Sequence, residues 1–435
     1  MRISHCFNGD KLIFNFFPEK LDRPRNPKIG SHGEFMFRFS DGRDFPSVHP
    51  DRLALVAIMN TLPFVEETLK IGWPVSTSFI DATRIISRIK IVSESNDCPP
   101  VKRNIVGKPA LSFSGGADST AALAIMPLNT EPVFMLRTES NSRTLYDSDA
   151  ALESCRKLSR LGYQVNIVES DFEYLRTPVG FPTDLSIATP AILISESRGF
   201  DSIAFGTILE SAYGTSGPDY RNYSDSSHFR LWSKLFDAVG LGYSLPVAGV
   251  SEIASSKLCR DHPLGVVHQS CIRGKWDKPC LKCWKCFRKS TVMAALESGE
   301  IPEISISMLH DSSEVRKRLL EDKPIKHEGV LAYSLQRVGG GGEVVEALRL
   351  LTRSDSLKTE WMEFWYPKSS ELIDASYRVY SVEKLKRHLG AMSSDQISEL
   401  ESWKNVHDEV RQERLNLLSQ LLNYPSIIER AKKRF

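Results

Sequence analysis

The chain has 435 residues, of which 25% are charged and 41% hydrophobic, and its formal net charge is +2. This length predicts two or three domains with full apolar cores. The near-neutral charge argues against a nucleic-acid-binding platform. No segment is long and apolar enough to cross a membrane, and the N-terminal residues lack the apolar stretch of a secretory signal. We therefore expect a cytoplasmic protein without membrane or nucleic-acid partners.

Residues 1–107 are expected to form an N-terminal α+β domain. Lys11–Phe17 and Glu34–Phe39 alternate apolar and polar residues as strands of an antiparallel sheet do. Asp51–Met59 has helical spacing, and Asn96–Pro100 is typical of a linker.

A strand, a tight turn and a helix follow at residues 108–126. The strand ends at Ser114, the turn is Gly115-Gly116, and the Ala-rich run from Ala117 to Met126 favours a helix. The two glycines allow a ligand to approach the backbone closely. Hydroxyl groups and the free N–H groups of the first helical turn attract anions. We expect a phosphate here, although a Gly-Gly turn can also open an ordinary helix.

The turn lacks the Gly-Lys-Ser/Thr of a Walker A loop and the Gly-x-Gly-x-x-Gly of a dinucleotide fold. Residues 114–119, Ser-Gly-Gly-Ala-Asp-Ser, resemble the loop of the PP-loop ATP pyrophosphatases. The resemblance implies an adenine nucleotide alpha hydrolase-like fold in residues 108–295. It also implies cleavage of ATP to AMP and pyrophosphate, with the AMP group activating an oxygen of a second substrate.

The same resemblance assigns roles to individual residues. Asp118 and Ser119 would be catalytic, and Asp118 would meet the phosphates through Mg²⁺. The residues expected to bind the nucleotide are Ser112, Ser114, Gly115, Gly116, Asp118, Ser119, Thr120, Arg137 and Gly206.

Strands and helices alternate through residues 108–205, which predicts a parallel sheet with crossover helices. Ligands of such sheets bind beyond the carboxyl ends of the strands. This rule points to Arg137–Glu139, Glu169 and Gly206–Thr207, which can equally serve to brace the loops. The polar segment Glu210–Asp225 could hold a second substrate or be a surface excursion. In and beside it, the candidate bases are Glu210, Asp219, Asp225 and His228.

Half of the cysteines lie within a short segment. Cys271, Cys280, Cys283 and Cys286 offer four thiolates in the pattern of a closed structural zinc site. An iron–sulfur cluster is the competing interpretation, since it also accepts four cysteines. Cys6, Cys98, Cys155 and Cys259 are scattered and are expected to be buried small apolar residues.

Two families within the PP-loop superfamily resemble this chain. Leu245–Ser290 resembles the 7-cyano-7-deazaguanine synthases, which close the same domain with four cysteines at this spacing. A likeness that covers more of the chain is to the ATP-dependent UDP-N-acetylmuramoyl-L-alanyl-L-glutamate epimerases, in Ser211–Gly214, Trp232–Lys234 and the stretch from Tyr243 to Glu252. The cysteine spacing is closer to that of the synthases.

These resemblances imply an adenylating enzyme that uses ATP, Mg²⁺ and Zn²⁺ and acts on a carboxylate-bearing small molecule or peptide. Epimerisation of a peptidyl or amino-acid carboxylate is the first hypothesis, and amide or nitrile formation of the synthase kind is the second. A nucleotide-binding scaffold protein is a third, which the acid in the loop disfavours. Residues 296–435 are expected to form a mostly helical C-terminal domain, because apolar and charged residues alternate with helical period. The oligomeric state is left open.

Overall fold

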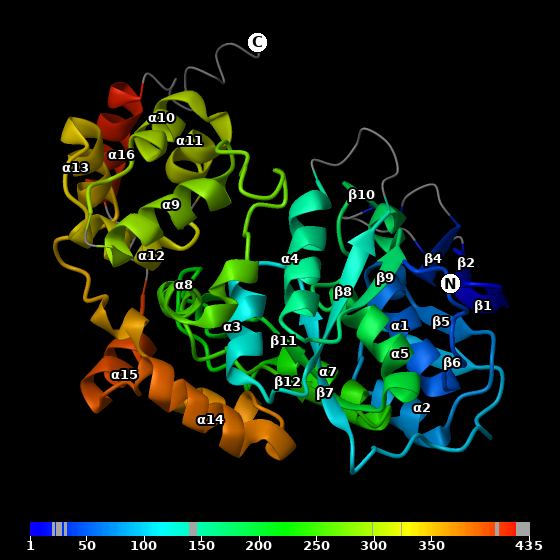
Figure 1. The fold of residues 1–435 in the computed structure, drawn as a ribbon. Coiled ribbons are helices and arrows are strands. Elements are labelled where there is room, and N and C mark those ends of the chain that lie inside the picture. The colour runs from blue at the N-terminus through cyan, green and yellow to red at the C-terminus, as the bar shows by residue number, and fades with distance from the viewer. Residues whose placement is uncertain are drawn as a thin grey trace, which may run out of the picture.

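The structure is a computed structural model that describes residues 1–19, 22, 28–29, 33–138, 146–297, 299–322, 324–404 and 409–422. Its centre is a ten-stranded sheet with the order β12-β11-β7-β8-β9-β4-β2-β1-β5-β6 (Figure 1). These strands are β1 Arg2–Asn8, β2 Lys11–Phe17, β4 Glu34–Phe39, β5 Thr68–Ile71, β6 Lys90–Ser93, β7 Lys108–Phe113, β8 Glu131–Arg137, β9 Asn166–Ser170, β11 Phe200–Phe205 and β12 Gly242–Ser244. A second, two-stranded sheet pairs β3 (Lys28–Ile29) with β10 (Arg176–Thr177).

The strands from β12 to β9 in this order are all parallel, as the alternating pattern predicts. β9 then pairs antiparallel with β4, with Phe37 opposite Ser170 and Phe39 opposite Val168. Through this junction the N-terminal strands extend the parallel sheet. The prediction of an α/β fold with a large, mostly parallel sheet is confirmed. The division into three domains stays a prediction, and its boundary at residue 107 falls within one sheet.

Helices cover both faces of the sheet and form a separate group beside it. The helices up to the cysteine segment and just after it are α1 Pro50–Thr61, α2 Thr77–Thr83, α3 Ala117–Ile125, α4 Asp149–Arg160, α5 Thr189–Arg198, α6 Leu209–Ala212, α7 Ser227–Ala238, α8 Glu252–Asp261 and α9 Trp284–Leu296. The remainder are α10 Glu303–Asp311, α11 Ser313–Leu320, α12 Glu328–Arg337, α13 Gly342–Leu351, α14 Ala375–Leu389, α15 Ser394–Glu401 and α16 Glu409–Leu421. Short 3₁₀ helices span Leu62–Phe64, Phe172–Leu175, Ser186–Ala188, Pro263–Val267, Glu360–Glu363 and Pro367–Leu372.

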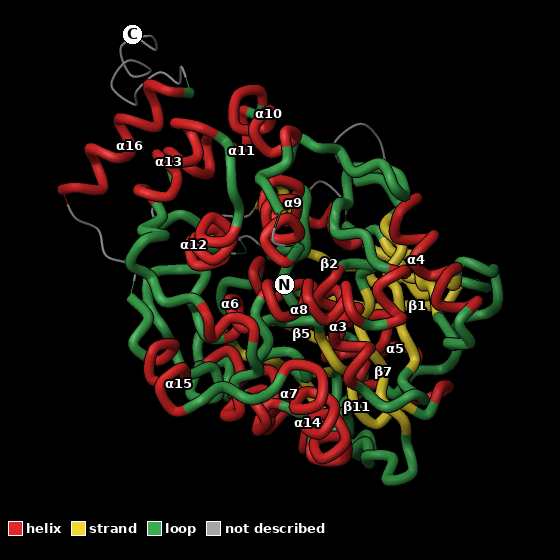
Figure 2. Tube along the Cα trace, turned by 60° about the vertical axis from the view of Figure 1, so that its left-hand side comes forward, coloured by secondary structure: helices red, strands yellow, loops and turns green. Residues whose placement is uncertain are grey.

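The helices α9 to α13 and α16 group together on the opposite side of α3 and α8 from most of the sheet (Figure 1). Figure 2 shows the same arrangement in a turned view, with α9 and α12 on one side of α8 and α14 on the other. The helices α9 to α13 and α16 thus form a helical layer from the C-terminal part of the chain. The loops that leave the carboxyl ends of β7 and β11 face this helical layer.

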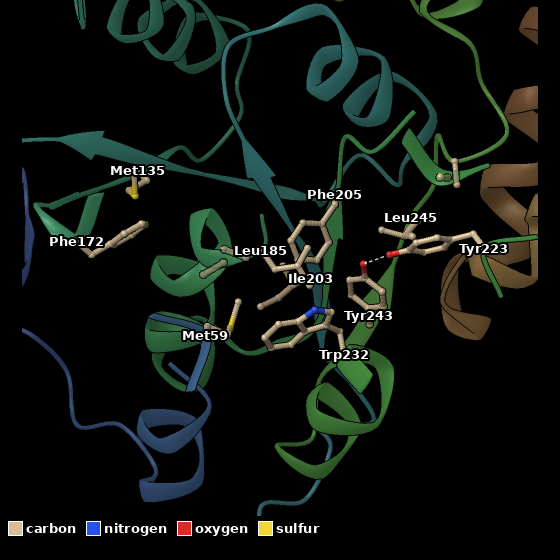
Figure 3. Packing of buried hydrophobic residues seen from close by; sticks show 14 of the residues in the cluster. Met59, Met135, Phe172, Leu185, Ile203, Phe205, Tyr223, Trp232, Tyr243 and Leu245 are labelled. Atoms are coloured by element: carbon tan, nitrogen blue, oxygen red, sulfur yellow. Dashed lines mark hydrogen bonds between the residues drawn. The ribbon is translucent and has the colours of Figure 1, made fainter. Parts of the chain in front are cut away.

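The core is rich in aromatic side chains. Trp232 of α7 is buried among the residues drawn in Figure 3, where the Tyr223 and Tyr243 hydroxyls hydrogen-bond at 3.1 Å. Trp361 and Trp365 are also buried, so their aromatic-rich segment packs as core. Replacing such a residue by Ala costs about 3–5 kcal/mol. Within the described ranges, no helix combines the length and the apolar character needed to cross a bilayer.

Candidate functional site

A cavity of about 610 Å³ lies at the carboxyl ends of β7 and β11. One wall is the β7–α3 turn with Ser114, Gly116, Asp118 and Ser119, and the end of β11 from Phe205 to Ile208. The facing wall comes from the cysteine segment and the helical layer, and it carries basic side chains: Arg273, Lys285, Arg288, Arg318, Lys326 and His327. The cavity thus lies where ligands of parallel sheets bind, and its walls come from segments far apart in the sequence.

The β7–α3 turn is held by the hydroxyl group of Ser119. This hydroxyl donates to the carbonyl of Gly116 at 3.1 Å and accepts the backbone N–H of Ser114 at 3.3 Å. Gly115 has φ of +75°, a conformation that side-chain-bearing residues rarely adopt. Because α3 begins directly after Gly116, the N–H groups of its first turn have no acceptor within the helix. The turn therefore presents donors and the positive end of a helix dipole to the cavity.

Gly206 brings the end of β11 against the start of α3. A Cβ at Gly206 would lie 2.8 Å from the backbone N of Ser119 and 3.0 Å from the carbonyl carbon of Asp118. Only glycine allows this approach without a shift of the backbone. The predicted residues Ser112, Ser114, Gly116, Asp118, Ser119 and Gly206 all line the cavity.

Asp118 belongs to a charged cluster that joins the turn to α8 and α9. Its carboxylate accepts the Ser255 hydroxyl at 3.0 Å and lies 3.9 Å from the Lys289 ammonium group. Lys289 also lies 3.3 Å from the carboxylate of Glu252. Burial acts to lower the pKa of Lys289, but the charges of Glu252 and Asp118 outweigh it, so the pKa is raised.

Glu252 is the buried centre of this cluster. Its carboxylate accepts from Arg288 at 3.0 Å and lies 3.3 Å from Nδ1 of His327, the residue just before α12. Burial acts to raise the pKa of Glu252, but Arg288 and Lys289 outweigh it, and the pKa lies below its ordinary value. Burial lowers the pKa of His327 to about 3, so this ring is neutral. The ionised Glu252 thus ties the helical layer to the wall that contains Asp118.

Lys285 is a site residue that the sequence analysis missed. It lines the cavity, and its ammonium nitrogen lies 3.9 Å from the position that a Cβ on Gly116 would take. Among the described residues, no carboxylate forms an ion pair with Lys285. The only sequence signal for Lys285 is its place between Cys283 and Cys286, because the β7–α3 turn and the cysteine segment meet only in the folded chain.

Other predicted residues lie outside the cavity. Arg137 forms an ion pair with Glu173 at 3.2 Å and packs over the rings of Tyr146 and Phe181. Gly115 belongs to the turn but lies against Ser154 of α4, and Thr120 is buried. Glu169 pairs with Arg38 of β4 at 2.6 Å, a bracing role. Glu139 lies outside the described residues.

None of the candidate bases Glu210, Asp219, Asp225 and His228 is among the residues that line the cavity. His228 Nε2 lies 3.1 Å from Asp184, and Asp184 does line it. From the polar segment 210–225, Ser211 alone among the described residues reaches the cavity wall. The segment also contains part of the short helix α6, although its glycine content argues against helix.

The four clustered cysteines form a geometry that suits one metal ion. All four sulfur atoms lie within 4.8 Å of one another, and Cys286 Sγ is 3.5 Å from Cys283 Sγ and 3.8 Å from Cys280 Sγ. Tetrahedral zinc with Zn–S bonds of about 2.3 Å requires sulfur–sulfur distances of about 3.8 Å. The backbone N–H of Cys280 donates to Cys271 Sγ at 3.3 Å, a contact that stabilises a thiolate. The cluster could therefore hold a metal ion such as zinc.

The scattered cysteines differ from expectation in part. Cys155 and Cys259 are buried as predicted. Cys6 is exposed and Cys98 is half-buried, so for Cys6 the expectation was wrong. Cys6 lies on β1, and successive residues of a strand point to opposite faces of a sheet.

Comparison with known families gives one match, to a model described as a family of unknown function (DUF6395), over residues 231–404. The matched segment begins within α7 and includes the four cysteines, but it does not include the β7–α3 turn. No curated protein matches the chain significantly.

Proposed function

We propose that this protein is a PP-loop enzyme that cleaves ATP to AMP and pyrophosphate in order to adenylate a carboxylate. The observation that carries the proposal is the cavity in which the Ser114–Ser119 turn and the Asp118 carboxylate face Lys285. A turn rich in N–H donors opposite basic side chains suits a polyphosphate. An acid within the same wall suits a nucleotide that arrives with a divalent cation.

The roles of the residues follow from their positions. The turn and Lys285 would hold the phosphates, and Arg288 would add positive charge from α9. Asp118, oriented by the Ser255 hydroxyl, would hold Mg²⁺. A bound Mg²⁺ neutralises phosphate charge and orients the leaving group.

In the reaction, a carboxylate oxygen of the second substrate attacks the α-phosphorus of ATP. The bond from that phosphorus to the bridging oxygen breaks, and pyrophosphate leaves with the electron pair. Lys285 stabilises the charge that builds up on the phosphate oxygens, since its ammonium group is already in place. The product is an acyl-adenylate, which is far more reactive than the free acid.

The cysteine cluster has a structural role in this proposal. Four thiolates leave no coordination position for water, so the metal would hold the segment from Cys271 to α9 in place. That segment carries Lys285 and Arg288 into the cavity. The short sulfur–sulfur distances favour a single ion over an iron–sulfur cluster, which would place several atoms between the thiolates.

For the step after adenylation, we propose inversion of the carbon next to the activated carboxylate. An acyl-adenylate has lost the carboxylate charge, so its α-proton is easier to remove. Asp184 lines the cavity and is paired with His228, so it would serve as the base for this step. Amide or nitrile formation is the second candidate, favoured by the tight cysteine spacing.

The test is to identify the nucleotide products. Purified protein is incubated with ATP, Mg²⁺ and candidate acids, and the nucleotides are separated by chromatography. We expect AMP and pyrophosphate, and we expect Asp118→Ala and Asp118→Asn to abolish both. Formation of ADP and orthophosphate would refute the proposal.

A further inference from the structure

A second, smaller chamber shares part of its lining with the cavity. Its volume is about 290 Å³, less than half that of the cavity, and its surface is mainly apolar. The two spaces share the lining residues Ser270, Cys271 and Lys285. The chamber therefore lies next to the phosphate turn but is separate from the space that would take the nucleotide.

The chamber is lined by both cationic and apolar side chains. Lys285 and Lys289 supply ammonium groups, and Pro279, Leu281 and Met293 supply apolar surface. Lys289 already contacts Glu252 and donates to the Ser256 hydroxyl at 3.1 Å. Lys285 lines both spaces, so its ammonium group can contact a carboxylate in the chamber as well as the phosphates in the cavity. The ammonium group of Lys285 suits a carboxylate. The apolar surface matches an apolar body.

Ser270 marks the boundary between the two spaces. Its hydroxyl oxygen accepts the backbone N–H of Ala117, the first residue of α3, at 3.3 Å. The hydroxyl proton remains available for an anion on either side. A carboxylate bound at Lys285 and Ser270 would thus lie at the start of α3, where the phosphates are expected.

We propose that the second chamber binds the substrate that is adenylated, and that this substrate is a compact monocarboxylic acid with an apolar body. The carboxylate lies at Lys285, and the apolar body lies against Leu281 and Met293. The location rests on the proposed function, because it places the carboxylate beside the α-phosphate of ATP. One carboxylate oxygen then forms the new bond to phosphorus as pyrophosphate departs, without any proton or oxidant.

The experiment measures exchange of radiolabelled pyrophosphate into ATP with hexanoate, phenylacetate or N-acetyl-leucine as the probe acid. Hexanamide, the neutral counterpart of hexanoate, is the control ligand. We expect at least one of the acids to support exchange and hexanamide to support none. Met293→Trp fills the chamber and should lower kcat/KM for the acid at least about tenfold, while KM for ATP stays within about twofold.

Three further variants control for misfolding. Leu281→Trp fills the chamber from a different segment and should act like Met293→Trp, and Met293→Leu should retain exchange. Val379→Trp adds the same bulk at an 82% exposed site and should have no effect. Thermal unfolding compares the fold of all four variants.

The outcomes separate the two proposals. If ATP does not bind and no acid supports exchange, the proposed function fails, and the chamber assignment falls with it. If AMP and pyrophosphate form, but only from acids too large for the chamber and equally well in Met293→Trp, the chamber assignment alone is wrong.

Discussion

The carboxyl group of Glu210 accepts the backbone N–H of Glu252 through both of its oxygen atoms, at 2.9 and 3.0 Å. Both side chains are buried, yet their pKa values move in opposite directions. Burial and the neighbouring charge of Glu252 raise the pKa of Glu210 to about 8. Glu252 stays ionised because Arg288 and Lys289 surround it. Glu210 is thus a neutral acid at pH 7, placed directly behind the charged cluster of the cavity.

The first prediction concerns the pH dependence of stability. The pKa of Glu210 is about 8 in the folded protein and 4.5 in its ordinary environment, which the unfolded chain provides. As the pH rises, the unfolded chain therefore loses this proton at a lower pH than the folded protein does. The free energy of unfolding should therefore fall between pH 5 and 8, by at most about 1.4 kcal/mol per pH unit. Glu210→Gln keeps the acceptor but cannot ionise, so it should remove this part of the slope.

The measurement is urea unfolding at several pH values for both proteins. The difference between wild type and Glu210→Gln isolates this group from the histidines that titrate in the same range. Glu252 does not interfere, because its contribution is lost only below its ordinary pKa of 4.5. An unchanged slope would show that Glu210 is ionised in the folded protein.

A second prediction concerns Lys285. Lys285→Ala removes a charge-assisted contact to phosphate worth about 1.5–3 kcal/mol, so the Kd for ATP should rise roughly ten- to a hundredfold. Lys282→Ala, at an exposed lysine of the same segment, should leave the Kd unchanged. Calorimetric titration with ATP and Mg²⁺ provides the comparison. Equal affinity in the two variants would remove Lys285 from the nucleotide site.

The third prediction is that the purified protein contains one zinc ion per chain. Elemental analysis should find zinc, and the protein should show no visible absorbance from iron. Cys283→Ser should lose the metal and unfold at lower temperature, because metal binding contributes to folding. Cys6→Ser, at an exposed cysteine, is the matched control and should keep the zinc. Iron with visible absorbance would establish the competing interpretation.

A fourth prediction follows from the close approach at Gly206. Gly206→Ala places a methyl group against the backbone of Asp118 and Ser119, which should displace the start of α3. Such overpacking costs typically about 1–3 kcal/mol of stability, and ATP binding should weaken further than stability alone explains. Gly299→Ala, where the nearest atom is 3.7 Å away, should do neither. Retained ATP affinity in Gly206→Ala would argue against phosphate binding at this turn.

The fifth prediction separates the two reactions that could follow adenylation. In deuterated water with ATP and a substrate acid, an epimerase incorporates deuterium at the α-carbon. This uptake should depend on ATP and be lost in Asp118→Ala and in Asp184→Asn. Product formation that requires ammonia and shows no deuterium uptake would instead assign the protein to amide or nitrile synthesis.

Local patterns predicted the parts of the site that lie together in the sequence. The glycines and hydroxyls between Ser112 and Ser119 predicted the β7–α3 turn, since one strand–turn–helix unit contains all of them. The cysteine spacing predicted a cluster for the same reason. The cations of the facing wall could not be predicted, because Lys285 meets Gly116 only through the packing of α9 against α8 in the folded chain.

The elements that were missed are short or lack a periodic pattern. β5, β6 and β12 have three or four residues each, too few for alternation to be recognised. In the C-terminal part, which was expected to be mostly helical, α15 ends at Glu401 and α16 begins at Glu409. Arg137 is the last residue of the parallel strand β8, but Glu173 and two aromatic rings hold it away from the cavity.

The antiparallel pairing of β4 with β9 also determines how the protein can be divided. A fragment starting at Lys108 would leave β9 as an open edge, with unpaired backbone groups that recruit other strands and promote aggregation. It would also uncover the apolar surface that Phe35 and Phe37 share with Phe172. The smallest part that can be expressed or transplanted with an intact nucleotide loop must therefore include the N-terminal strands.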